Sequence, residues 1–124
     1  MARERILIIQ EDPALAGKMK LRLHRMGFTH CAVCNGDDIF QKIEAFKPDL
    51  ALVDVKGANG SDNVDLAQML YSLYGLTVVF FSVSPDTQPT GADIPAKLLG
   101  YTAGQSQEKR VKSLMKMVFN KMGI

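Results

Sequence analysis

The chain has little of what several specialised protein classes require. It contains two cysteines, no tryptophan and a formal net charge of only +2. Its apolar runs extend for four or five residues, whereas a membrane-spanning helix needs about 20, so we expect no membrane segment. The first residues are too charged for a secretory signal, and we predict a cytoplasmic location. The small net charge gives no support to direct nucleic-acid binding.

The two cysteines, Cys31 and Cys34, are spaced as a C-x-x-C pair. A zinc site would need a second pair of ligands. A redox pair of the thioredoxin type lies at a helix start, whereas these residues fall in a predicted strand. Because strand residues three apart point to opposite faces, we interpret both cysteines as buried structural thiols.

The 124 residues and their ordinary globular composition fit one domain, 1–124. Two runs, 6–9 and 50–53, are fully apolar and rich in branched residues, which is typical of strands buried on both faces. Strand and helix patterns alternate four times with short connections between them. This alternation predicts an α/β fold in which helices cover both faces of a parallel sheet.

Each predicted helix before the last strands carries an apolar stripe. The stripes are Leu15, Met19, Leu23 and Met26, then Ile39, Phe40, Ile43 and Phe46, then Leu66, Leu70 and Leu73 with Tyr74 as a further candidate. The stretch 84–95 occupies the place of a fourth helix but holds three prolines, each costing about 3 kcal/mol inside a helix. We therefore predict a shortened or irregular fourth helix, then a short strand over 97–101 and a C-terminal helix starting near Ser106.

Polar residues follow three of the predicted strands. They are Glu11 and Asp12 after the first, Asp54 after the third and Ser82 after the fourth. The carboxyl ends of parallel strands meet at one edge of a sheet, where carboxylates could hold Mg²⁺ through oxygen atoms. The ion would offset the charge of a phosphoryl group arriving at Asp54, and the Ser82 hydroxyl could hydrogen-bond it. The plainer alternative is an Asp54 that merely ends a strand.

In their order and spacing, these segments resemble the receiver domain of two-component response regulators over essentially the whole chain. The similar segments are 6–13 with its acidic cluster, 48–54 ending in Asp54, 80–82 ending in Ser82, and Gly100-Tyr101. The resemblance implies a flavodoxin-like three-layer αβα sandwich. Its sheet would have five parallel strands in the order 2-1-3-4-5.

The resemblance also implies a function for the site. Asp54 would accept a phosphoryl group from a histidine kinase or a histidine phosphotransfer protein, with Ser82 and Tyr101 as switch residues. The implied Mg²⁺ ligands are Glu11, Asp54 and the backbone carbonyl of Lys56, with Asp12 as a further candidate. We expect a signalling domain and not an enzyme, with an output domain or a homodimer as further partners.

The chain departs from the family pattern at two places. Neutral Gln10 stands at the first acidic position, and Gly104 and Gln105 stand where the family has a lysine and a proline after the fifth strand. Lys56 or Lys97 could supply the missing cation. We predict an atypical receiver that is phosphorylated with altered efficiency. The alternative is a phosphorylation-independent pseudo-receiver that acts as an interaction or dimerisation module. A flavodoxin-like enzyme is disfavoured because no Gly-rich phosphate loop follows the first strand.

Overall fold

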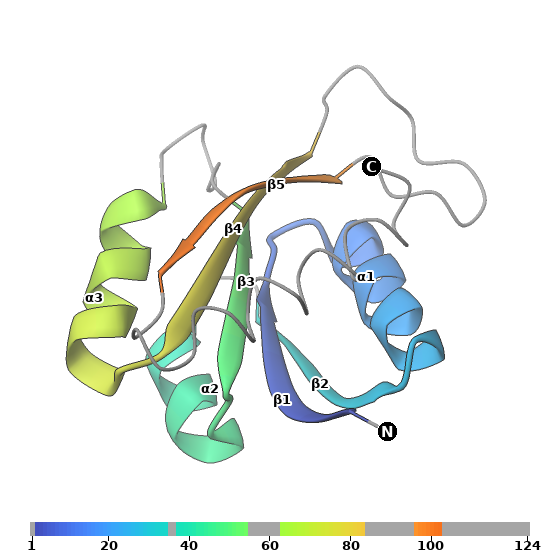
Figure 1. The fold of residues 1–124 in the computed structure, drawn as a ribbon, viewed down its shortest axis with the longest axis horizontal. Helices are drawn as coiled ribbons and strands as arrows, with labels where there is room; N and C mark the ends of the chain where they lie inside the picture. Colours follow the sequence, from blue (N-terminus) through green and yellow to red (C-terminus); the bar gives the residue numbers. More distant parts are fainter. Residues whose placement is uncertain (1, 35–36, 55–62, 84–95, 103–124) are drawn as a thin grey trace.

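The computed structural model describes residues 2–34, 37–54, 63–83 and 96–102. Its elements are β1 (Ala2–Ile9), α1 (Pro13–Arg25), β2 (Phe28–Cys34), α2 (Ile39–Phe46), β3 (Leu50–Asp54), α3 (Val64–Tyr74), β4 (Thr77–Val83) and β5 (Ala96–Thr102). In Figure 1 a twisted sheet crosses the centre, with α1 on one side and α3 on the other. No helix in this described part is long and apolar enough to cross a membrane.

The five strands form one sheet in the order β2-β1-β3-β4-β5. The pairs β1–β2, β1–β3 and β3–β4 are all parallel. The predicted α/β class, the flavodoxin-like layering and the strand order are therefore confirmed.

The direction of the last strand is a correction, because β5 runs antiparallel to β4. If β5 were parallel to β4, the chain would need a crossover that returns it to the end of the sheet where β4 begins. Such a crossover is usually a helix. The connection 84–95 carries three prolines, which oppose a helix. An antiparallel edge strand needs no crossover. The predicted fourth helix and the predicted C-terminal helix lie outside the described residues.

The core consists of two apolar clusters separated by the sheet. Ile6 and Ile8 belong to the cluster under α1, whereas Leu7 and Ile9 belong to the cluster under α2 and α3, as expected for the alternation of side chains along a strand. Residues 6–9 and 50–53 are at most 3% exposed. The prediction that these two runs are strands buried on both faces is confirmed.

Two predicted helix stripes are wrong in part. Leu15, Met19 and Leu23 of α1 are buried as expected. In contrast, two side chains predicted to be internal are exposed, Phe40 by 43% and Leu73 by 65%, and so is the further candidate Tyr74, by 39%. The rings of Phe40 and Tyr74 lie 6.3 Å apart between their centroids, so they pack against each other at the surface between α2 and α3. On these short helices, the face that packs against the sheet is narrower than the face that carries apolar residues.

The two cysteines lie on opposite faces of the sheet, as predicted. Cys31 packs against the α1 cluster and is half-buried, whereas Cys34 is buried in the α2–α3 cluster. Neither cysteine forms a disulfide bond. The Cys31 Sγ donates to the carbonyl of Phe28 and the Cys34 Sγ donates to Asp38 Oδ1, each at 3.2 Å. Burial raises the pKa of the Cys31 thiol, and the positive charge of Lys20 acts in the opposite direction.

Candidate functional site

Asp54 is the last residue of β3 and stands at the carboxyl edge of the sheet. Its strand lies between β1 and β4, and its backbone pairs with Phe81. The preceding run Leu50–Val53 is buried, whereas Asp54 itself is half-buried. The strand therefore delivers one carboxylate from the core to the boundary with solvent.

Gln10 contacts this carboxylate. It follows β1, is only 6% exposed, and is fixed by its backbone N–H, which donates to the carbonyl of Cys34 at 3.0 Å. Its side-chain Nε2 donates to Asp54 Oδ2 at 2.8 Å. Its Oε1 accepts from the backbone N–H of Asp12 at 3.1 Å. Because a carboxylate only accepts and a backbone N–H only donates, the two partners determine the orientation of the amide.

The two acidic residues after Gln10 have different environments. Asp12 is the N-cap of α1: its Oδ1 accepts from the backbone N–H groups of Ala14 at 3.0 Å and Leu15 at 3.3 Å. This bonding satisfies donors that a helix start leaves without intrahelical partners. Glu11 is exposed. The Asp12 carboxylate, a candidate metal ligand in the sequence analysis, is thus bonded to the helix backbone.

Asn63 holds the other side of Asp54, and the sequence analysis missed it. Its Nδ2 donates to the backbone carbonyl of Asp54 at 2.8 Å. Its own carbonyl accepts from the N–H of Ala67 in the first turn of α3 at 3.0 Å. An asparagine just before a helical apolar pattern is the available sequence signal, because asparagine is favoured at helix starts.

The antiparallel direction of β5 changes the neighbours of Ser82. In the backbone register, Lys97 lies opposite Ser82 and Tyr101 lies opposite Val79. Tyr101 is therefore three residues along β4 from Ser82, which corresponds to about 10 Å. The switch roles of Ser82 and Tyr101 stay predictions. Lys56, Gly104 and Gln105 lie outside the described residues.

The described residues give no direct support to the expected magnesium centre, and one of its predicted ligands, Lys56, lies outside them. In the ranges that the structure describes, no group of three or more His, Cys, Asp or Glu side chains could hold a metal ion. Asp54 Oδ2 accepts from an amide, and Asp12 Oδ1 accepts from a helix backbone. The Mg²⁺ site stays a prediction, and it has no geometric support in these residues.

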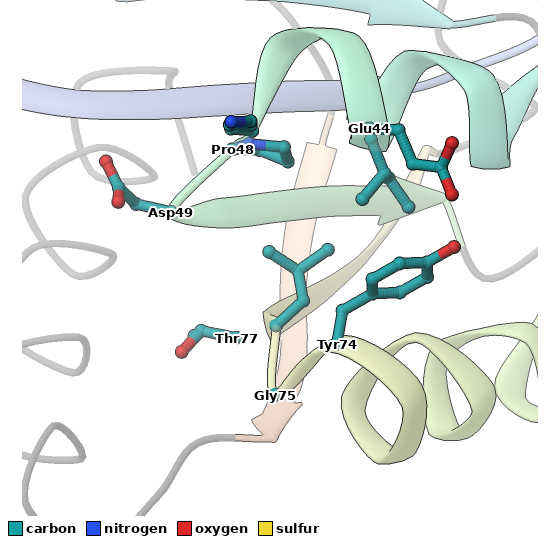
Figure 2. A pocket seen from close by; sticks show the side chains of 9 residues that line it. Glu44, Pro48, Asp49, Tyr74, Gly75 and Thr77 are labelled. Atoms are coloured by element: carbon teal, nitrogen blue, oxygen red, sulfur yellow. The ribbon is translucent and has the colours of Figure 1, made fainter.

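A hollow of about 630 Å³ opens at the opposite edge of the sheet, at the amino ends of β3 and β4. Figure 2 shows Glu44 from α2, Tyr74 from the end of α3, and Asp49 and Thr77 around it. The carboxylate of Asp49 accepts from the backbone N–H of Arg5 at 2.8 Å. Among the predicted site residues whose side chains the structure describes, Glu11, Asp12 and Asp54, none lines this hollow.

Comparison with known proteins gives the following relatives. No protein-family model matches the chain. The DNA-binding response regulator MtrA of Mycolicibacterium smegmatis is 28% identical over 85 residues, covering 68% of this chain. The matched part is 37% of the length of MtrA, so the relative extends well beyond the region in common.

Two solved structures are similar in fold. The signal receiver domain of a modulated diguanylate cyclase from Desulfovibrio desulfuricans G20, described as an example of alternate folding, is 26% identical with a TM-score of 0.56 over 68% of each chain. The anti-anti-sigma factor PhyR of Bartonella quintana, solved in complex with the anti-sigma factor NepR, has a TM-score of 0.65. That match covers 94% of this chain and 47% of PhyR at 16% identity, a level at which the likeness concerns the fold.

Proposed function

We propose that this chain, which is related to the receiver domains of response regulators, is a signalling module that acts through protein–protein contacts without phosphorylation of Asp54 as its switch. The observation that carries the proposal is the 2.8 Å hydrogen bond from Gln10 Nε2 to Asp54 Oδ2. In a receiver with a complete acidic cluster, a carboxylate would stand at position 10 in place of this amide.

The physical argument concerns charge. A phosphoryl group that approaches a carboxylate brings further negative charge, and catalysis of phosphoryl transfer relies largely on positioning and on electrostatic stabilisation of that charge. The Gln10 amide donates one hydrogen bond but adds no positive charge. A unit-charge interaction at about 4 Å corresponds to about 4 kcal/mol at an effective dielectric constant near 20. If the site without a carboxylate at position 10 loses one such interaction with a bound cation, phosphoryl transfer would slow by roughly a thousandfold.

The second candidate function is the phosphoacceptor of the sequence analysis, with altered efficiency. One observation favours it: Asp54 ends β3 at the carboxyl edge of the sheet and is only half-buried, with the exposed Glu11 following β1 at the same edge. In this case a histidine kinase or a histidine phosphotransfer protein would be the partner, and Mg²⁺ would be required.

The partner of the first function would be another protein. The fold neighbour PhyR was solved with a protein partner, NepR, and by analogy we propose a protein partner, an output domain or a second copy for this chain. We propose no direct contact with nucleic acid, in keeping with the net charge of +2. We also propose a cytoplasmic location and no enzymatic activity of its own.

Treatment with a small-molecule phosphodonor and Mg²⁺ tests the two functions against each other. The wild type and the Asp54→Asn variant would be analysed by intact mass, with beryllofluoride titrations followed in the amide NMR spectrum. A receiver with a complete acidic cluster would serve as the control for donor activity. We expect neither an adduct nor a spectral change in the wild type. A Mg²⁺-dependent adduct on the wild type that is absent from Asp54→Asn would establish the second function instead.

A further inference from the structure

A continuous series of hydrogen bonds joins the start of α1 to the start of α3 through Asp54. On one side, Asp12 caps α1 and its own N–H donates to Gln10 Oε1. Gln10 Nε2 then donates to Asp54 Oδ2. On the other side, the Asp54 carbonyl accepts from Asn63, whose carbonyl accepts from the first turn of α3. The series crosses from β1 to β3, which are neighbours in the sheet.

The Gln10 side chain makes both of its hydrogen bonds without the help of an extra proton or an ion. Its amide presents an acceptor to the N–H of Asp12 and a donor to the carboxylate of Asp54. A carboxylate at position 10 could still accept from Asp12 but would have no hydrogen for Asp54. The side chain is also 94% buried, since it is only 6% exposed, so bulk water cannot freely replace the lost donor.

We propose that the Gln10 amide takes the place of a cation: it positions the Asp54 carboxylate and couples it to α1, and a carboxylate at position 10 would convert the same site into one that requires a divalent cation. The inference rests on the proposed function in one respect, namely that Asp54 is held without a metal ion. It identifies Gln10 as a positioning residue and not as a lost ligand.

The Gln10→Glu variant exchanges the donor for an acceptor of nearly the same shape. Two carboxylate oxygens would then face each other where an N–H···O bond of 2.8 Å now lies. Two negative charges at this separation repel each other, which disfavours the state in which both carboxylates are ionised. A hard divalent cation relieves this repulsion because it binds carboxylate oxygens, and the exposed Glu11 is the adjacent residue in the chain.

Thermal unfolding with chelator and with added Mg²⁺ or Mn²⁺ tests the proposal, together with a cation titration followed in the amide NMR spectrum. The matched control is Gln41→Glu, which makes the same chemical change on an exposed side chain of α2. In chelator, we expect a lower Tm for Gln10→Glu than for Gln41→Glu. Added cation should raise the Tm of Gln10→Glu alone, and its Mg²⁺ affinity should exceed that of the wild type by at least about tenfold, because more carboxylate ligands strengthen binding.

The proposal is overturned if Gln10→Glu gains no cation affinity over the wild type, or if the wild type binds Mg²⁺ as tightly as the variant. Should Gln10→Glu fail to fold in chelator, refolding on addition of cation supports the proposal. If it does not fold with cation either, the shorter Gln10→Asp variant decides by the same criteria. Failure of the proposed function is seen separately, because phosphoryl transfer to wild-type Asp54 would contradict that function while these cation measurements on position 10 could still hold.

Discussion

Asp12 and Gln10 are bonded to each other through the backbone N–H of Asp12, which donates to Gln10 Oε1 at 3.1 Å, while the Asp12 carboxylate caps α1. This pairing gives Asp12 a structural role. Asp12→Ala should lower the free energy of unfolding by about 1 kcal/mol, the usual cost of losing an N-cap. Glu11→Ala, at the exposed neighbour, should change it by less than about 0.5 kcal/mol. Urea denaturation compares the two, and equal losses would contradict the assignment.

Removal of the Gln10 side chain should be more costly. Gln10→Ala deletes a hydrogen bond to a charged group at a buried position, so we expect a loss of about 1.5–3 kcal/mol in the free energy of unfolding. Gln41→Ala, on the exposed face of α2, is the control and should be nearly neutral. A Gln10→Ala protein as stable as Gln41→Ala would mean that the bond to Asp54 contributes nothing in solution.

Asn63→Ala should act locally at the start of α3. The variant loses the 2.8 Å bond to the Asp54 carbonyl, which corresponds to a net contribution of about 1 kcal/mol. Hydrogen exchange should become faster in the first turn of α3, at the N–H of Ala67, and stay unchanged in α1. Equal acceleration in both helices would indicate a global loss of stability and would argue against a local link.

Two leucines of α3 provide an internal comparison for the side of the helix that is buried. Leu70 is fully buried and Leu73 is 65% exposed. Leu70→Ala should therefore cost about 2–5 kcal/mol, whereas Leu73→Ala should cost less than about 0.5 kcal/mol. Denaturant unfolding of both variants checks this. A large loss for Leu73→Ala would support the stripe that the sequence predicts.

The sequence was most informative where one local signal decides the outcome. The apolar runs 6–9 and 50–53 have to be buried, and short connections between strand and helix patterns favour right-handed parallel units. The strand order itself was implied by the resemblance to receiver domains. The direction of β5 was not predictable from its own residues, because it depends on whether 84–95 can provide a crossover. Comparison with the family pattern treats Gln10 as a missing carboxylate, and only the three-dimensional structure shows that its amide donates a hydrogen bond to Asp54.

The Cys31 thiol should make the stability of the folded protein depend on pH. Burial raises its pKa in the folded state, so the folded protein holds this proton more strongly than the unfolded chain does. The resulting stabilisation is complete below the unfolded pKa of about 8.5 and is lost as the pH rises through the folded pKa. Cys31→Ala should therefore show a shallower decrease of stability over this alkaline range. An identical pH dependence in the variant and the wild type would contradict the prediction.

The most direct test of the account is the NMR signal of the Gln10 side-chain amide in the wild-type protein. If this amide holds the Asp54 carboxylate in place of a cation, one of its protons should be protected from solvent exchange. The signal should stay unchanged in excess Mg²⁺ and should move in Asp54→Asn, because that variant removes the charged acceptor. A Gln10 amide that exchanges freely, or that is displaced when Mg²⁺ binds beside Asp54, would contradict the account.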